Sequence, residues 1–424
     1  MAYQPNVVVW ETTYKCNAKC IHCGSDCASV EKPKELTTAQ CFDIIQDLEK
    51  IGAKLVILSG GEPLLRKDIG ALAGALHRAN IKVGIISNCL ALNEETIKLV
   101  KAMNLIAYGM SLDGATAYMH DYIRGHKGTF KAVMNAIDLL HANDIIPSVV
   151  TTVHKLNFHQ LPAIRDLLIQ KGVRLWQIQY ADFIGRMPRE AMLTEGQFFE
   201  LSKFILDTKC NYAQYFDEVS GADVMGYMSD YSTKYLQGPW YGCHAGMNAL
   251  GLGSDGSVRG CLSLQRDEYI EGYTTERSLK EIWDDPKSFP YNRQFDISML
   301  TGYCHDCIYA AICKGGCIRS ATSKCNERCN PYCLYKIEKD GFTSEEQAKI
   351  YFSKEEIAKL YEPIAPLPEE FWEAPLPKSI MGDEDDEVAD NSVIIKNKTA
   401  KKVSRKIKST SKTKGVKKNG KKNK

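Results

Sequence analysis

The sequence predicts an α/β protein: a partial (β/α)6 barrel followed by a small cysteine-rich domain and a disordered C-terminal tail. Strand-like and helix-like segments alternate six times through residues 6–210. Repeated strand–helix units form parallel sheets with crossover helices. A closed eight-unit barrel needs about 250 residues, so six units favour a barrel that is open on one side. The 16 cysteines of the 424-residue chain fall mainly into two groups, one near residue 20 and one beyond residue 240.

The expected strands are short runs rich in apolar or β-branched residues, as strands buried on both faces require. They lie at residues 7–10, 55–58, 83–87, 106–110, 146–150 and 175–179. The expected helices lie between them, at residues 38–51, 69–79, 94–103, 130–141 and 161–170. Thr37 and Asn93 are the expected N-caps, because such side chains accept from the free amides of a first helical turn.

Composition divides the chain into further segments. We expect the barrel over residues 1–210, a linker over 211–240, a cysteine-rich domain over 241–340 and a helical segment over 341–377. The sequence GSDGSVRGC at residues 253–261 predicts a hairpin centred on Asp255 and Gly256. Residues 378–424 are highly charged and poor in apolar residues, which predicts disorder.

Composition also excludes some classes of protein. No run approaches the ~18 apolar residues of a membrane helix, and the N-terminus has no signal-peptide pattern, so we expect a cytoplasmic protein. Cysteines in such a chain favour metal or redox chemistry over disulfides. The net charge of +2 hides a basic tail, because residues 391–424 hold 14 Lys or Arg and no acidic residue. The tail could attract an acidic leader peptide, bind nucleic acid non-specifically or only aid solubility.

The first cysteine group directly follows the first expected strand. Cys16, Cys20 and Cys23 have the spacing C-x3-C-x2-C, and three nearby thiolates can hold one soft metal centre. Three ligands on a four-iron cluster would leave one iron open, and zinc is the alternative. The carboxyl end of a barrel strand is where such folds place their sites.

The second expected strand ends in Gly60, Gly61, Glu62 and Pro63. Two glycines let the backbone approach a ligand closely, and the Glu can accept from an ammonium group. With the cysteine motif before it, this segment resembles the radical SAM superfamily.

That resemblance implies a cofactor for each motif. The three cysteines would hold a [4Fe–4S] cluster whose open iron binds S-adenosylmethionine, and the Gly60–Pro63 segment would hold the methionine ammonium. Cleavage of S-adenosylmethionine would give a 5′-deoxyadenosyl radical that removes a hydrogen from the substrate. An external electron donor such as flavodoxin or ferredoxin is implied.

Three further residues are implied to bind the cofactor. Ser111 and Arg124 match residues that contact the methionine carboxylate in related maturases; the alternative is a turn-capping serine and a surface arginine. Asn88 lies in an S-N-C segment where relatives often have T-N-G, so Cys89 replaces a glycine. His22 stands where the family often has an aromatic residue.

The second cysteine group resembles the SPASM extension, which holds up to two auxiliary clusters. Cys304, Cys307, Cys313 and one late cysteine would bind the distal cluster. Cys325, Cys329 and Cys333 compete for that last position, and Cys333 is preferred. The proximal cluster would take Cys243, Cys261 and Cys317, with a possible open iron; a zinc ribbon is the alternative. Of the other cysteines, Cys41 and Cys210 are expected to be buried in helices, and Cys27 is unassigned.

Enzymes with this extension mostly modify peptides or proteins. The resemblance therefore implies a peptide maturase that forms thioether or carbon–carbon crosslinks or epimerises residues. The alternatives are a sulfatase-maturating enzyme, an enzyme acting on a cofactor precursor, and a non-catalytic electron carrier. The first strand begins at residue 7, so we expect leader recognition to need a separate protein or the C-terminal segment. We expect neither a membrane nor a nucleic-acid partner.

Overall fold

The computed structural model describes residues 3–27, 32–221, 225, 227–229, 240–322 and 328–340, which belong to one compact unit. The expected helix at 341–377, the expected tail at 378–424, Cys325 and much of the expected linker lie outside the described residues.

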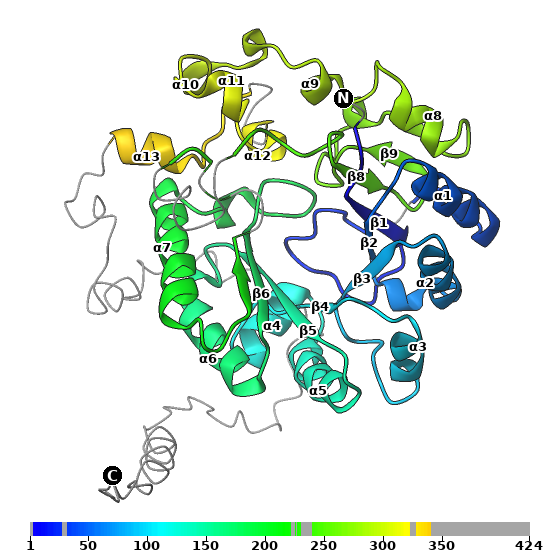
Figure 1. Ribbon diagram of the computed structural model, residues 1–424. Coiled ribbons are helices and arrows are strands. Elements are labelled where there is room, and N and C mark those ends of the chain that lie inside the picture. Colours follow the sequence, from blue (N-terminus) through cyan, green and yellow to red (C-terminus); the bar gives the residue numbers. More distant parts are fainter. Residues whose placement is uncertain are drawn as a thin grey trace, which may run out of the picture. The chain divides into compact units, whose positions relative to one another are not determined.

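A ten-stranded sheet runs through the described residues in the order β10-β9-β8-β1-β2-β3-β4-β5-β6-β7 (Figure 1). The strands are β1 (Val7–Thr13), β2 (Leu55–Gly60), β3 (Lys82–Ser87), β4 (Tyr108–Ser111), β5 (Pro147–Val153), β6 (Leu175–Tyr180), β7 (Glu218–Ser220), β8 (Ala249–Leu252), β9 (Ser257–Arg259) and β10 (Gly272–Tyr273). Strands β1 to β7 pair in parallel with their neighbours. The ends of the sheet, β7 and β10, are not paired with each other, so the predicted open barrel is confirmed.

Helices on the outside of the sheet connect successive strands (Figure 1). The crossover helices are α1 (Thr38–Lys50), α2 (Ile69–Arg78), α3 (Thr96–Ala102), α5 (Thr129–Ala142) and α6 (Leu161–Lys171). Thr37 caps α1 as predicted, in a reciprocal pair with Gln40. The predicted N-cap Asn93 lies two residues before the observed N-cap, because α3 begins at Thr96. The side chain of Asn93 still accepts hydrogen bonds from the amides of Glu95 and Thr96, at 2.9 and 3.0 Å.

Three elements of the barrel were not predicted. They are α4 (Ala117–Arg124), α7 (Glu195–Asn211) and β7, which extends the sheet from within the expected linker. Cys210 lies near the end of α7 and is exposed, so its predicted burial is wrong; Cys41 is buried on α1 as predicted.

The predicted hairpin joins the C-terminal region to the barrel sheet. Strands β8 and β9 are antiparallel, and Asp255 and Gly256 lie in the turn between them. On its other side β8 pairs in parallel with β1, from Val7 opposite Ala249 to Trp10 opposite Leu252. The hairpin is therefore part of the same sheet. As far as residue 340, the described part of the chain then forms six short α-helices: α8 (Leu279–Asp284), α9 (Pro290–Arg293), α10 (Gly302–His305), α11 (Ala310–Cys313), α12 (Ile318–Thr322) and α13 (Leu334–Asp340).

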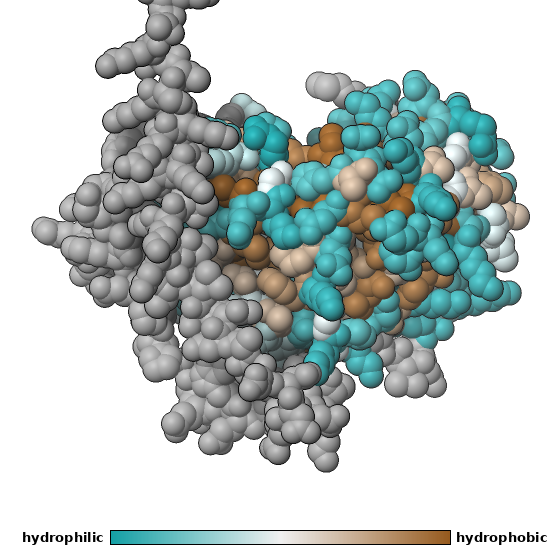
Figure 2. Space-filling view, turned by 90° about the horizontal axis from the view of Figure 1, so that it is seen from below, coloured by the Kyte–Doolittle hydropathy of each residue, from teal (hydrophilic) through white to brown (hydrophobic). Residues whose placement is uncertain are grey.

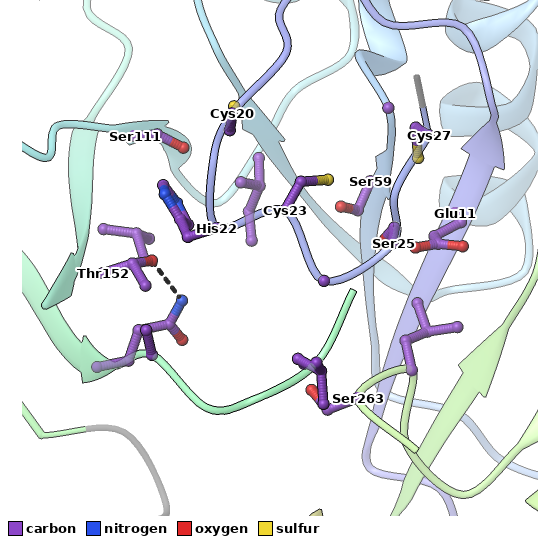
Figure 3. A pocket seen from close by; sticks show the side chains of 18 of the residues that line it. Glu11, Cys20, His22, Cys23, Ser25, Cys27, Ser59, Ser111, Thr152 and Ser263 are labelled. Atoms are coloured by element: carbon purple, nitrogen blue, oxygen red, sulfur yellow. Dashed lines mark hydrogen bonds between the residues drawn. The ribbon is translucent and has the colours of Figure 1, made fainter. Parts of the chain in front are cut away.

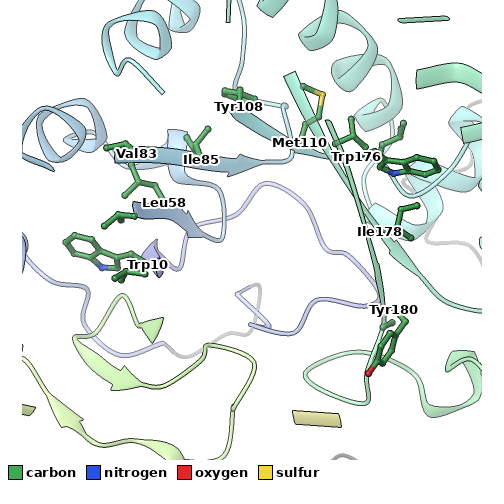
Figure 4. Packing of buried hydrophobic residues seen from close by; sticks show 14 of the residues in the cluster. Trp10, Leu58, Val83, Ile85, Tyr108, Met110, Trp176, Ile178 and Tyr180 are labelled. Atoms are coloured by element: carbon green, nitrogen blue, oxygen red, sulfur yellow. The ribbon is translucent and has the colours of Figure 1, made fainter. Parts of the chain in front are cut away.

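Buried hydrophobic side chains from the strands of the sheet contribute to the hydrophobic core. Figure 4 shows it as side chains from β1, β2, β3, β4 and β6, among them the fully buried Trp10 and Tyr108. The indole of Trp176, also buried, donates to Thr151 Oγ1 at 2.9 Å. On the face in Figure 2, hydrophilic residues predominate and hydrophobic ones show between them, which is normal for a folded chain. Within the described residues, no helix has the length and apolar character needed to cross a membrane.

Candidate active site

A cavity of about 340 Å³ opens at the carboxyl ends of the parallel strands. Residues on strands β1 to β6 and in the segments that follow β1, β2, β3 and β6 line it, together with Arg124 on α4 and with residues after β9 and on α12. Cys16, Cys20 and Cys23 all line this cavity, and Figure 3 shows Cys20 and Cys23 on one loop beside it. The structure therefore brings the three predicted thiols to one site.

The cysteine loop is attached to the end of α4. Lys19 N donates to Arg124 O at 3.1 Å, and Ile21 N donates to Ile123 O at 2.9 Å. Gly125 ends the helix in the left-handed region, with φ of +61°. A Cβ atom there would lie 2.2 Å from Lys19 O, so only glycine permits this approach.

The two predicted glycines hold the other side of the loop. A Cβ atom on Gly60 would lie 2.3 Å from Thr13 O, and one on Gly61 would lie 2.3 Å from Lys15 O. Gly61 N donates to Thr13 O, and Glu62 N donates to Lys15 O, both at 2.8 Å. The glycines thus allow the backbone of the cysteine loop to lie against the end of β2, and both also line the cavity.

Glu62 is fully buried, and its carboxylate is occupied by the protein itself. It accepts from Ser87 Oγ at 2.9 and 3.0 Å, from Asn88 N at 2.8 Å and from Leu64 N at 3.2 Å. Burial raises the pKa of Glu62 despite these bonds. Glu62 is not among the residues that line the cavity, whereas Asn88 is. Pro63 is buried behind it, at the start of a short 3-10 turn.

Asn88 lies against the first cysteine. Its Nδ2 donates to Asn17 Oδ1 at 2.8 Å and lies 3.8 Å from Cys16 Sγ. The next residue, Cys89, has φ of +68°, a conformation that favours glycine. This explains why the resemblance leads one to expect glycine there.

Ser111 and Arg124 meet in the cavity wall although they come from β4 and α4. Arg124 Nη1 pairs with Asp113 Oδ2 at 3.1 Å, and its side chain is only 12% exposed. Arg124 is therefore not a surface residue, and its contact with the methionine carboxylate stays a prediction.

His22 belongs to a buried group around Asp113. Its Nε2 lies 3.6 Å from Asp113 Oδ2, and its ring lies 5.7 Å from that of His154. Burial lowers the pKa of both rings to about 3, so both are neutral at neutral pH.

Residues after β6 were missed by sequence analysis. Arg186 Nε donates to Cys20 O at 2.9 Å, its N donates to Cys23 O at 3.0 Å, and its guanidinium pairs with Asp26 at 2.7 Å. Gly185 has φ of +55° and a Cβ there would lie 2.2 Å from Cys23 O. A Gly–Arg pair just after a predicted strand was the available signal.

Glu11 and Cys27 also line the cavity and are buried (Figure 3). Glu11 interrupts an apolar strand, which was a signal for a functional position, and its carboxylate accepts a hydrogen bond from Ser25 Oγ. Burial raises its pKa. The thiol of Cys27 forms a hydrogen bond with Cys23. This hydrogen bond lowers the pKa of the Cys23 thiol to about 5.

The C-terminal cysteines form two groups. Cys243 and Cys317 are hydrogen-bonded, and Cys261 is close enough to interact electrostatically with both. The other group lines a second, small cavity, and its members are Cys304, Cys307, Cys313 and Cys333. Cys329 is hydrogen-bonded to Cys304 but does not line that cavity. All 15 described cysteines are free thiols.

The thiolate chemistry of these donor sets fits iron–sulfur clusters. Among the described side chains, no three Cys, His, Asp or Glu converge on a point that could hold one metal ion. A four-iron cluster is larger, and its thiolates surround it at wider separations. Three thiols beside the guanidinium of Arg124, in a cavity of this size, fit a cluster with a small charged ligand.

Comparison with known proteins identifies the class. The radical SAM superfamily model matches residues 10–168, and the SPASM model, an iron–sulfur cluster-binding domain, matches residues 243–308. The chain therefore contains a radical SAM domain followed by a SPASM domain. Its cofactors are S-adenosylmethionine and iron–sulfur clusters.

Individual relatives differ in their activities. The AdoMet-dependent heme synthase of Methanosarcina barkeri is 28% identical over 79% of this chain and 98% of its own length. The mycofactocin maturase MftC of Mycobacterium ulcerans is 29% identical over 74% of this chain and 83% of its own.

Among solved structures, SuiB of Streptococcus suis bound to S-adenosylmethionine has a TM-score of 0.63 and 18% identity. The match covers 78% of this chain and 76% of SuiB. At this identity the likeness establishes a shared fold.

Proposed function

We propose that this radical SAM/SPASM enzyme modifies a peptide by abstracting a hydrogen atom, in the cavity beside the first cysteine loop. The bound cluster and S-adenosylmethionine supply the hydrogen-abstracting species. The chain binds and orients that cofactor and the substrate, and it keeps water away from both.

Each predicted residue has a role in this proposal. Cys16, Cys20 and Cys23 hold the first cluster. Ser111 and Arg124 bind the methionine carboxylate, because a guanidinium on a cavity wall makes a strong, directional contact with a carboxylate. Arg124 keeps its orientation through the ion pair with Asp113 at 3.1 Å.

The Gly60–Pro63 segment acts mainly through its backbone. Gly60 and Gly61 line the cavity, so their peptide groups can face the methionine ammonium. The Glu62 carboxylate positions Asn88 by accepting a hydrogen bond of 2.8 Å from the Asn88 backbone N–H. Pro63 starts the turn that fixes the Glu62 side chain.

The C-terminal cysteines hold auxiliary clusters in this proposal. The proximal cluster takes Cys243, Cys261 and Cys317. The distal cluster takes Cys304, Cys307, Cys313 and Cys333, since these four line one small cavity.

The residues that line the main cavity are the observation that favours a peptide substrate. Besides the cofactor residues, the lining includes hydroxyl and carboxamide side chains: Thr152, Gln177, Gln179, Ser263 and Gln265. Gln179 Nε2 donates to Thr152 Oγ1 at 3.0 Å, seen as the dashed line in Figure 3. Such groups both donate and accept, as a peptide backbone requires. SuiB, which shares the fold, has been solved with its precursor peptide SuiA bound.

Tetrapyrrole modification is the second candidate. It is one form of the cofactor-precursor alternative given by the sequence, and it is favoured by the match over 98% of the length of the Methanosarcina barkeri heme synthase. A macrocycle would need a broad apolar surface, and the apolar side chains of Val9, Ile86, Val150, Ile184 and Leu262 also line the cavity. The hydroxyl and carboxamide side chains placed among them favour a peptide.

The experiment compares the two substrates directly. The anaerobically reconstituted, reduced enzyme is incubated with S-adenosylmethionine and either the short peptide encoded beside its gene or an iron porphyrin. We expect 5′-deoxyadenosine together with a change in peptide mass: loss of two hydrogen atoms for a crosslink, or gain of one deuterium in deuterated water for epimerisation. Conversion of the porphyrin alone would refute the peptide proposal. No 5′-deoxyadenosine above a Cys16→Ala control would refute the catalytic one.

A further inference from the structure

A buried ion pair joins the barrel to the C-terminal domain in the wall of the main cavity. Asp182 follows β6, and Arg319 lies on α12. Arg319 Nε donates to Asp182 Oδ2 at 3.0 Å, and Ser320 Oγ donates to the same oxygen at 2.6 Å. The Asp182 side chain is fully buried and that of Arg319 is 13% exposed. Both residues line the cavity.

This pair leaves one acceptor and one donor unused. Asp182 Oδ1 and Arg319 Nη2 are buried and have no hydrogen-bond partner among the described residues. Buried polar atoms are nearly always hydrogen-bonded, and leaving one unpaired on a charged group is costly. Because both residues line the cavity, a ligand bound there can supply the missing partners.

We propose that Asp182 and Arg319 bind one amide unit of the substrate; this inference rests on the proposed function and specifies what its site recognises. Asp182 Oδ1 accepts from the substrate N–H, and Arg319 donates to the substrate C=O. A peptide bond or carboxamide offers one donor and one acceptor, which matches the pair.

A carboxylate ligand does not match. It offers only acceptors, so it could pair with Arg319 but would meet the negatively charged oxygen of Asp182. The residues assigned to S-adenosylmethionine come from β2, β3, β4 and α4, whereas this pair comes from β6 and α12. The pair is thus available to the substrate, and it fixes the substrate from two domains at once.

The test measures binding of two small probes to the full-length, reconstituted enzyme in the presence of S-adenosylmethionine. N-acetylglycinamide is neutral and carries amide units, whereas propionate carries a carboxylate. Ligand-observed NMR gives Kd values for the wild type, Asp182→Asn and Arg319→Lys. Asp207→Asn is the matched control, because Asp207 forms an ion pair of similar burial with Arg165, at 3.1 Å and outside the cavity.

We expect the wild type and the control to prefer N-acetylglycinamide. Each site variant should weaken its binding about tenfold or more, because each removes a hydrogen bond to a charged group. The Kd for S-adenosylmethionine should change by less than about twofold, which separates this role from a cofactor contact or from general damage.

Several results would overturn the inference: a preference for propionate, equal amide binding by wild type and both variants, or no binding of either probe. A parallel loss of S-adenosylmethionine binding would assign the pair to the cofactor instead. Any of these could occur while the peptide is still converted, which would leave the proposed function standing. Conversion of the porphyrin with amide binding intact would refute the function and not the amide site.

Discussion

Replacing Gly125 by alanine tests whether the end of α4 sets the position of the cysteine loop. A Cβ atom at this position would lie 2.2 Å from Lys19 O and 2.7 Å from Lys19 C. Gly128 is a matched control, because it also has a positive φ, +90°, but a Cβ there would meet nothing within 4 Å.

Both substitutions strain the backbone, but only one of them also causes a collision. Each places a side chain in the left-handed region, which costs about 1–2 kcal/mol of stability. Only Gly125→Ala also collides with the loop, and ordinary contact at 3.4 Å would require the Lys19 carbonyl to move by about 1 Å. Cys20 is the next residue, so the thiol would be displaced. A displacement of about 1 Å costs roughly a hundredfold in rate when it misplaces reacting groups.

The assay measures iron and sulfide per chain after anaerobic reconstitution, the rate of 5′-deoxyadenosine formation, and stability in urea. We expect both variants to lose about 1–2 kcal/mol of stability through the strained backbone, and Gly125→Ala to lose more because of the collision. Only Gly125→Ala should lose iron or slow by about a hundredfold. Equal iron content and equal rates in the two variants would refute the claim that α4 positions the cysteine loop.

Three further predictions concern other parts of the molecule. Cys333→Ala should lose one cluster's worth of iron and Cys329→Ala should not, because Cys333 lines the small cavity and Cys329 does not; the reverse result would reassign the ligand. The pKa of buried His154 is lowered to about 3, so the unfolded chain binds an extra proton below about pH 6.5, and stability falls as the pH drops. His154→Phe should reduce that loss by up to about 1.4 kcal/mol per pH unit in urea titrations between pH 6.5 and 5, and an unchanged slope would contradict this. Arg165→Leu should cost about 3 kcal/mol in the same assay by leaving the buried Asp207 unpaired, without loss of iron; a neutral change would show that the ion pair is dispensable.

Local patterns predicted much of the fold because their causes are local. Strand β2 is a short apolar run, and α1 begins where the Thr37 side chain can accept from its first turn. Helix α7 was missed because several of its polar residues, including Gln197 and Lys203, are buried, which obscures its apolar face. Its reciprocal N-terminal cap, Thr194 with Gln197, was the readable signal.

In the site, too, local motifs could be predicted and contacts between distant residues could not. The cysteine motif and the glycine pair are each contiguous in the chain, so their chemistry could be read directly. Asp182 and Arg319 lie 137 positions apart, and neither has a neighbour in the sequence that suggests the other. Nor could the side-chain bonds of Glu62 be foreseen, because they depend on how β2 and β3 align.

Pairing between β1 and β8 has a consequence for protein synthesis. Val7 emerges from the ribosome some 240 residues before its partner Ala249. At about 5–20 residues per second, one edge of β1 waits about 10–50 s for its neighbour. Unpaired strand edges are templates for aggregation, and pairings this distant in the chain form slowly. A nascent chain that stalls before residue 249 therefore carries an open, apolar strand edge, and it depends on a chaperone or on rapid completion to avoid misassembly.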